Sequence, residues 1–199
     1  ETCAFDITGA EFVREGDPGE IVVITDDGVE SIKYADRSQH FCIFEFVYFS
    51  RPDSVIDNKN VHAVRKQFGR NLAREYVPNV DLVVPVPDSG IPSAMGYSEA
   101  SGIPYDLGIT RNHYVGRTFI EPEDSVRHLG VKMKHNANSS VLKGKRIALI
   151  DDSIVRGTTS RKLIEMVRQA GAVEVHLLIT SPPTVNSCYY GIDTPTKEE

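Results

Sequence analysis

The chain is organised around one segment, Arg146-Ile147-Ala148-Leu149-Ile150-Asp151-Asp152-Ser153-Ile154-Val155-Arg156-Gly157-Thr158-Thr159-Ser160. It begins as a short apolar run, which is typical of a strand buried on both faces of a sheet. Two carboxylates and a small-residue turn follow, and then Leu163, Val167 and Ala170 recur at helical spacing, with Gly171 where a C-terminal cap belongs. The segment therefore predicts a strand, a loop and a helix.

The loop of this predicted unit is suited to bind a sugar phosphate. Free backbone N–H groups and the positive end of the helix dipole point at the loop, and Gly157 lets the backbone approach an anion closely. The hydroxyls of residues 158–160 add donors. Asp151 and Asp152 cannot hold a phosphate, but they suit the neighbouring hydroxyls of a sugar or the coordination shell of Mg²⁺. The segment therefore predicts a ribose-5-phosphate site.

An apolar strand followed by Asp-Asp-Ser-Ile-Val-Arg-Gly-Thr-Thr-Ser resembles the phosphoribosyl pyrophosphate (PRPP) signature of type I phosphoribosyltransferases. This form of the signature resembles that of the glutamine PRPP amidotransferase family. The simpler alternative is an ordinary strand-to-helix connection with surface acids. The resemblance implies that PRPP is bound by Asp151, Asp152, Ser153, Ile154, Val155, Arg156, Gly157, Thr158, Thr159 and Ser160.

A second strand–loop–helix unit precedes the signature. Residues 81–87 predict a strand, which stops at Asp88-Ser89-Gly90, and residues 91–101 predict a helix. In a parallel sheet the two loops lie at the same edge. The short loop resembles the pyrophosphate-binding loop of these transferases, which implies that Asp88, Ser89 and Gly90 also bind PRPP. By the same resemblance, Ser89, Asp151 and Asp152 hold Mg²⁺.

Residues 103–109 predict a third strand, and a long polar connection then leads to Lys143. Connections of this length in compact domains usually have a function. Basic residues gather in it although the protein is acidic, so a basic lid over a polyanionic substrate is favoured over merely solvated charge. Residues 114–120 also resemble the family's flexible loop. The lid residues so implied are Tyr114, Arg117, Lys132 and Lys134.

Three further segments are expected to be structural. Residues 42–54 are apolar and aromatic and predict a strand running into a turn, and they resemble the start of the family's transferase domain. Residues 173–180 predict another buried strand, in which His176 is a packed or edge histidine. A helix is predicted over residues 60–76. The residues expected on its packed face are Val61, Val64, Phe68, Leu72 and Tyr76.

The first 40 residues predict a hairpin, with strands at 20–25 and 29–34 joined by Asp26-Asp27-Gly28. Two strands alone do not make a stable unit. Residues 1–40 resemble the C-terminal remnant of the family's glutaminase domain, and residues 41–199 its phosphoribosyltransferase domain, C-terminally truncated. That glutaminase uses an N-terminal cysteine, whereas this chain starts with Glu1, and Cys3 matches no catalytic position. We therefore expect a truncated chain that does not hydrolyse glutamine.

Cys42 and Cys188 have two interpretations. Ordinary thiols are the simpler one. However, one branch of the resembled family carries a [4Fe–4S] cluster held by four cysteines, two of which fall at the positions of Cys42 and Cys188. The remaining pair belongs to a Cys-x-x-Cys that this chain does not contain. The resemblance thus implies a cluster in a full-length parent.

The composition of the chain argues against several functional classes. The chain has 199 residues, 28 acidic against 22 basic, and a net charge of −6, which argues against a nucleic-acid-binding surface. It contains no apolar run long enough for a membrane span and no signal peptide pattern. Three scattered cysteines do not form a disulfide framework, so a reducing cytoplasm is expected.

The fold expected is α/β, a mostly parallel sheet with helices on both faces and ligand loops at the carboxyl ends of its strands. The resemblance implies synthesis of 5-phosphoribosylamine and pyrophosphate from PRPP and ammonia derived from glutamine, the first step of purine biosynthesis. It further implies purine nucleotide inhibitors and a homo-oligomer, a tetramer when full length. No catalytic residue is assigned, because neutral ammonia needs no dedicated general base.

Two other functions stay open at this point. One is a phosphoribosyltransferase that salvages a nucleobase, which the glutaminase-like N-terminus disfavours. The other is a non-catalytic PRPP-binding regulator, which the presence of Ser89, both acids and residues 114–120 disfavours. Release of pyrophosphate from PRPP in the presence of ammonium would distinguish an enzyme from a regulator. A requirement for a nucleobase would distinguish the salvage enzyme from the amidotransferase.

Overall fold

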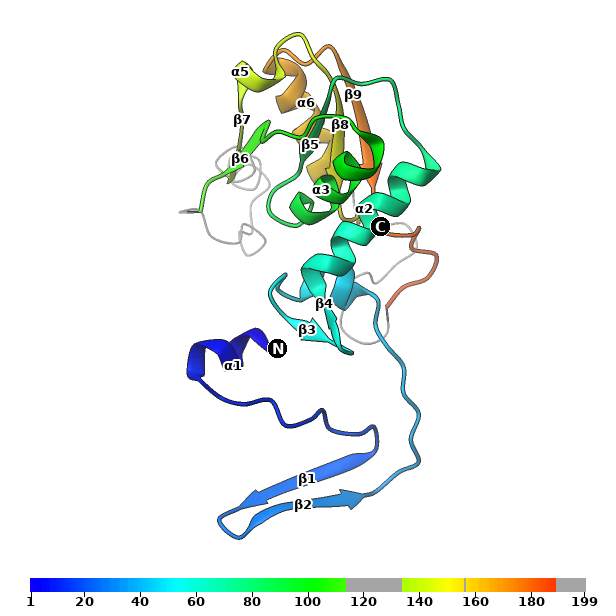
Figure 1. Ribbon diagram of the computed structural model, residues 1–199. Coiled ribbons are helices and arrows are strands. Elements are labelled where there is room, and N and C mark those ends of the chain that lie inside the picture. The colour runs from blue at the N-terminus through cyan, green and yellow to red at the C-terminus, as the bar shows by residue number, and fades with distance from the viewer. Residues whose placement is uncertain (114–133, 156, 189–199) are drawn as a thin grey trace, which may run out of the picture.

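The structure is a computed structural model that describes residues 1–113, 134–155 and 157–188 (Figure 1). At its centre lies a three-stranded parallel sheet with the strand order β5-β8-β9. All of β5 and all but the first residue of β8 are buried, as expected for strands covered on both faces. The sheet strands are β5 (Leu82–Pro85), β8 (Arg146–Asp151) and β9 (Glu174–Ile179).

Helices cover both faces of this sheet, as the sequence predicts (Figure 1). On one face Leu163 and Val167 of α6 pack against Leu149 of β8. On the other face Ala73 of α2 and Tyr97 of α3 belong to the core that includes alternate residues of β8. The covering helices are α2 (Val61–Glu75), α3 (Ile91–Ser101) and α6 (Thr158–Gln169).

Smaller elements surround this core. Of the segment 103–109, predicted to be a strand, only Tyr105 bridges to Val83 in parallel, and a short strand begins at Ile109. No described helix has the length and apolar character needed to cross a bilayer. The smaller elements are α1 (Cys3–Thr8), β1 (Glu20–Thr25), β2 (Gly28–Lys33), η1 (Glu45–Phe49), β3 (Val55–Ile56), β4 (Lys59–Asn60), β6 (Ile109–Arg111), β7 (His135–Ala137) and α5 (Ser139–Leu142).

The strand predicted over residues 42–54 is wrong, because Glu45–Phe49 forms a turn of π-helix. In a half-buried strand successive side chains alternate between core and solvent, but here the neighbours Phe46 and Val47 are both buried. The backbone has a tertiary partner instead of a neighbouring strand. Arg65 of α2 donates from Nε to the Phe46 carbonyl at 2.7 Å and from Nη2 to the Ser50 carbonyl at 2.8 Å.

Helix α2 is present where predicted, but its deepest row differs from the predicted one. The buried residues are Val61, Arg65, Gly69 and Ala73, spaced by four, whereas Tyr76 lies beyond the helix end and is 51% exposed. The reason is the way α3 approaches. The two helix backbones meet at small residues, so the larger apolar side chains stand to the side of the contact.

The contact between α2 and α3 has no room for a side chain. A Cβ on Gly69 would lie 1.8 Å from the Ser93 carbonyl oxygen, and one on Gly96 would lie 1.9 Å from the Lys66 carbonyl oxygen. The hydroxyl of Ser93 also donates to the carbonyl of Arg65 at 3.1 Å. Glycine at positions 69 and 96 therefore fixes where α3, and the loop in front of it, sits on the sheet.

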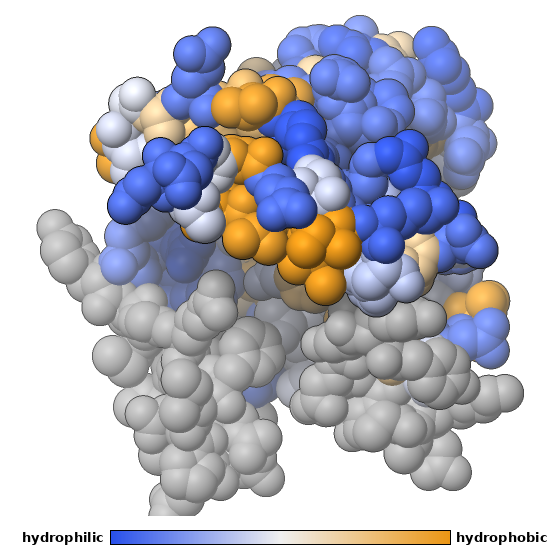
Figure 2. Space-filling model, turned by 90° about the horizontal axis from the view of Figure 1, so that it is seen from below, coloured by the Kyte–Doolittle hydropathy of each residue, from blue (hydrophilic) through white to orange (hydrophobic). Residues whose placement is uncertain are grey.

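The β1–β2 hairpin is confirmed, and it lies away from the parallel sheet (Figure 1). Its apolar side chains are exposed on both of its faces, since neighbouring residues of β1 point in opposite directions. The surface on this side of the molecule shows an apolar patch (Figure 2). Monomers rarely expose large apolar patches without a partner. The exposed hairpin residues are Ile21, Val22, Val23, Ile24, Val29 and Ile32.

Replacing Gly69 with alanine tests the α2–α3 contact. We expect Gly69→Ala to lower the free energy of unfolding by at least about 2 kcal/mol, because the added methyl group meets backbone that cannot turn away. Urea denaturation measures the change. Gly16→Ala is the matched control, since its Cβ would meet only a carboxylate oxygen of Glu20 at 3.9 Å. Equal effects of the two substitutions would contradict the close contact.

Candidate functional site

The loops that follow β5 and β8 meet at the carboxyl edge of the sheet. Their meeting follows from the parallel pairing of the two strands, and the N–H of Val86 extends that pairing by donating to the Ile150 carbonyl at 2.8 Å. Gly90 closes the first loop against β8. A Cβ at this position would lie 2.5 Å from the Ile150 carbonyl oxygen and 2.8 Å from that of Val86, so only glycine fits.

Two predicted site residues from different loops are in contact. The hydroxyl of Ser89 lies near the carboxylate of Asp152 and lowers its pKa, and the hydroxyl of Ser153 donates a hydrogen bond to the same carboxylate. Asp151 lies next to this group and accepts a hydrogen bond at 2.9 Å from the N–H of Asp152. The three residues predicted to share a cation, Ser89, Asp151 and Asp152, are thus brought together.

Both acids are almost completely buried. Asp151 is 8% and Asp152 5% exposed, and their carbonyls are held by the N–H groups of Thr180 at 3.1 Å and Ser181 at 2.9 Å. Burial, with the neighbouring charge of Asp152, raises the pKa of Asp151 to about 7. Burial also raises the pKa of Asp152, against the lowering effects of its two serine hydroxyls and the charge of Arg65.

This donor set fits a divalent cation. Two adjacent buried carboxylates disfavour full ionisation unless a positive charge neutralises them. Oxygen ligands from carboxylates and hydroxyls are those that Mg²⁺ prefers, usually with several waters and substrate phosphates completing its shell. Asp151, Asp152 and Ser89 would supply the protein's share of such a shell.

The N-terminus of α6 lies beside these acids. Gly157 adopts a left-handed backbone (φ 69°), the helix begins at Thr158, and Ser160 is buried in the first turn. Thr158 and Thr159 are exposed. A helix that begins here leaves its first N–H groups without partners in the helix, so an anion site at this position stays a prediction. Arg156 lies outside the described residues.

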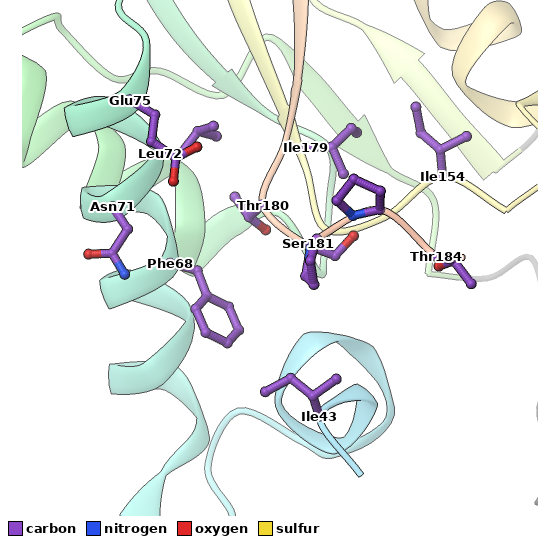
Figure 3. A pocket seen from close by; sticks show the side chains of 12 residues that line it. Ile43, Phe68, Asn71, Leu72, Glu75, Ile154, Ile179, Thr180, Ser181 and Thr184 are labelled. Carbon is purple, nitrogen blue, oxygen red and sulfur yellow. The ribbon is translucent and has the colours of Figure 1, made fainter. Parts of the chain in front are cut away.

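The two apolar members of the signature have exposed side chains. Ile154 is 44% and Val155 51% exposed. Ile154 lines a cavity of ≈ 800 Å³ that it shares with α2 and the segment after β9, where Phe68 and Ile43 face the cavity from the opposite side (Figure 3). The cavity is lined by Ile43, Phe68, Asn71, Leu72, Glu75, Ile154, Ile179, Thr180, Ser181, Pro182, Pro183 and Thr184.

The β6–β7 ribbon holds the first loop from its other side. Arg111 of β6 forms an ion pair with Asp88, and His135, its cross-strand partner in β7, has Nε2 3.3 Å from the Pro87 carbonyl oxygen. Sequence reasoning missed His135 altogether. Among the predicted lid residues the structure describes only Lys134, whose carbonyl accepts from the N–H of Asn112. Tyr114, Arg117 and Lys132 lie outside the described residues.

Arg65 is the second residue that sequence reasoning missed. It is 4% exposed, and its charge interacts with those of Asp152 and Glu1, while burial lowers its pKa. A buried arginine needs hydrogen-bond acceptors, which here are the two carbonyls at residues 46 and 50. The only signal in the sequence is the four-residue spacing with Val61, Gly69 and Ala73.

The cysteines do not assemble a cluster within the described chain. Cys42 is exposed and Cys188 intermediate in exposure. In the described ranges, no three His, Cys, Asp or Glu side chains gather in a group able to hold a metal ion. Cys42 and Cys188 supply at most two of the four thiolates that a [4Fe–4S] cluster needs.

Comparisons with known proteins agree with this geometry, although no protein-family model matches the chain. The chain is 53% identical over 200 residues to the amidophosphoribosyltransferase of Bacillus subtilis (strain 168), covering 100% of this chain and 42% of that protein. It is 55% identical over 200 residues to the amidophosphoribosyltransferase of Synechococcus elongatus, covering 100% of this chain and 41% of that protein.

A solved structure matches equally well. Glutamine phosphoribosylpyrophosphate amidotransferase from B. subtilis, complexed with ADP and GMP, has a TM-score of 0.89 and 53% identity, covering 100% of this chain and 44% of that one. The fold is therefore the α/β fold of type I phosphoribosyltransferases. Over its whole length the chain is similar to amidophosphoribosyltransferases, and it spans about two fifths of the length of the curated relatives it matches.

The buried acid pair predicts an unusual pH dependence. Because the folded state raises the pKa of Asp151 from 3.8 to about 7, it binds this proton more tightly than the unfolded chain does. The resulting stabilisation is lost as the pH rises from 5 to 8, by up to a few kcal/mol at about 1.4 kcal/mol per pKa unit. Urea denaturation in EDTA measures it.

Asp151→Asn isolates this contribution, since other groups also titrate. We expect the loss of stability between pH 5 and 8 to be smaller in Asp151→Asn than in the parent, and unchanged in the exposed-residue control Glu165→Gln. Adding Mg²⁺ at pH 8 should restore stability to the parent and to Glu165→Gln, but not to Asp151→Asn. The same pH slope in parent and Asp151→Asn would contradict the burial argument.

The Arg65 contacts predict a large effect on stability. We expect Arg65→Met to lower the free energy of unfolding by about 2–4 kcal/mol, because two buried carbonyls lose their donors. Arg65→Lys should recover less than half, since one ammonium group cannot reproduce the planar fork. Chemical denaturation provides the measurement, and the exposed Arg74→Met is the control. A loss below 1 kcal/mol would refute the role.

Proposed function

We propose that this chain forms the PRPP-binding part of an amidophosphoribosyltransferase, which makes 5-phosphoribosylamine and pyrophosphate from PRPP and ammonia derived from glutamine. The observation that carries the proposal is the parallel pairing of β5 with β8, which brings Gly90 of the first loop against Ile150, next to the buried acids Asp151 and Asp152. It joins a loop that resembles a pyrophosphate-binding loop to one that resembles the PRPP signature. The similarity to named amidophosphoribosyltransferases over the full length of the chain supports it.

Each part of the site has a task in this reaction. The first turn of α6 binds the 5-phosphate through its N–H groups and the hydroxyls of Thr158 and Thr159. Asp151 and Asp152 accept hydrogen bonds from the ribose hydroxyls. The loop of residues 88–90 would bind the diphosphate, and the lid role of Tyr114, Arg117, Lys132 and Lys134 is part of the same proposal. Ser89, Asp151 and Asp152 would hold Mg²⁺, which would neutralise charge on the diphosphate.

The chemical step exchanges one bond at C1 of the ribose for another. The bond between C1 and the diphosphate oxygen breaks, pyrophosphate leaves with the electron pair, and the ammonia nitrogen bonds to C1. The nitrogen then loses a proton to solvent. The positive charge that develops on the sugar lies near the buried acids, and the site has to exclude water, which would compete with ammonia.

The assignment of residues 1–40 to the tail of a glutaminase domain is part of the proposal. It is supported by the β1–β2 hairpin, whose apolar side chains are exposed on both faces and require a covering structure. Residues 41–199 then form the transferase domain. A [4Fe–4S] cluster does not fit Cys42 and Cys188 alone, so no step is assigned to it.

Regulation and assembly follow from the same proposal. The B. subtilis amidotransferase structure is a complex with ADP and GMP, which supports purine nucleotides as inhibitors of this chain's parent enzyme. A tetramer and a cytoplasmic location stay predictions.

Pyrophosphate release from PRPP and Mg²⁺ tests the function. We expect release with ammonium as the donor. Asp152→Asn should lower kcat/KM for PRPP on the order of 100-fold, because this carboxylate joins both loops, while Glu165→Gln should match the parent. Release that requires a nucleobase would favour a salvage enzyme. PRPP binding without release under any donor would favour a regulator.

A further inference from the structure

His135 is a buried polar side chain with an incomplete set of partners. It is 6% exposed, and its Nε2 lies 3.3 Å from the Pro87 carbonyl oxygen, whereas its Nδ1 has no hydrogen-bond partner among the described residues. Because a carbonyl can only accept, Nε2 has to carry the proton of this hydrogen bond. In the neutral ring, Nδ1 is then a buried acceptor without a donor. Such an unsatisfied acceptor does not contribute to the stability of the fold.

The charges around His135 favour that neutral ring. Burial lowers the pKa of His135, the positive charges of Lys134 and Arg111 lower it further, and the Pro87 carbonyl and Asp88 act in the opposite direction. The imidazole therefore serves as a single-proton donor to the loop at neutral pH. Its contact is a directed hydrogen bond and not an ion pair.

The ribbon that carries His135 holds two successive residues of the loop. Arg111 stands opposite His135 in the β6–β7 register and pairs with the side chain of Asp88, while His135 binds the backbone just before it. The far end of the loop is fixed at Gly90, which touches the Ile150 carbonyl. Ser89, between these two anchors, lies near the carboxylate of Asp152.

We propose that His135 is a positioning residue, which sets the orientation of the loop at residues 87–90 for the diphosphate of the substrate by donating a hydrogen bond to the Pro87 carbonyl. The inference rests on the proposed function, because that function places the diphosphate at this loop. His135 itself touches no substrate. Arg111 contacts only a side chain of the loop, whereas His135 contacts its backbone between the anchors at Val86 and Gly90.

Measurements of ligand binding to the full chain distinguish a role of His135 in positioning the loop from a role in the stability of the fold. The probes are PRPP with Mg²⁺, inorganic pyrophosphate with Mg²⁺, and ribose 5-phosphate, measured by calorimetry. We expect His135→Leu to weaken PRPP and pyrophosphate about five- to tenfold, the cost of one lost hydrogen bond, and to change ribose 5-phosphate less than twofold. His176→Leu is the control, since that strand histidine contacts Glu174 away from the loop.

Two polar replacements keep the test decisive if the leucine variant does not fold. The amide nitrogen of glutamine can take the place of Nε2, whereas that of asparagine reaches only as far as Nδ1. His135→Gln should therefore bind PRPP within about twofold of the parent, and His135→Asn should show the same loss as leucine. Equal PRPP affinities for glutamine and asparagine would overturn the inference.

The outcomes also distinguish this inference from the proposed function. If the parent chain binds neither PRPP nor ribose 5-phosphate, the proposed function fails, and the inference with it. If the parent binds PRPP but His135→Leu binds it equally well, or loses ribose 5-phosphate to the same extent, only the positioning role is refuted.

Discussion

The parallel pairing of β5 with β8 is the constraint on which the rest of the site depends. It places two loops at one edge of the sheet, although residues 91–150 separate them along the chain. The pairing continues one step past β5, through the N–H of Val86, and Gly90 then returns against the same strand. Without that close return, Ser89 would not reach Asp152, and the loops would form two separate turns.

The site concentrates negative charge where water cannot screen it. Asp151 and Asp152 are held in place through their backbones by the segment after β9, so their carboxylates cannot move apart. Two serine hydroxyls and the charge of Arg65 offset part of the cost for Asp152, while Asp151 receives only one backbone N–H. The protein thus stores an unfavourable pair that a cation or a polyhydroxylated ligand relieves.

Much of this arrangement could be predicted from the sequence, because local patterns specify it. The strand, loop and helix around Asp151 follow from an apolar run, a small-residue turn and a helical period, and the hairpin follows from Asp26-Asp27-Gly28. The π-helix at Glu45–Phe49 could not be predicted, since its aromatic residues favour a strand locally and a distant arginine decides otherwise. His135 was missed for the same reason, because its importance depends on a partner 48 residues away.

The contact between α2 and α3 also determines how the domain responds to force. At Gly69 and Gly96 the helices meet backbone against backbone, so no rotamer there can change to absorb a shift. Arg65, which holds the π-helix turn, is also in direct contact with the start of α3, because its carbonyl accepts the hydrogen bond of Ser93 at 3.1 Å. A small shift of the π-helix turn would therefore be passed on to the loop before Ile91. At an interface of flexible side chains, changes of rotamer would absorb such a shift. The α2–α3 contact therefore transmits strain through the interior of the domain.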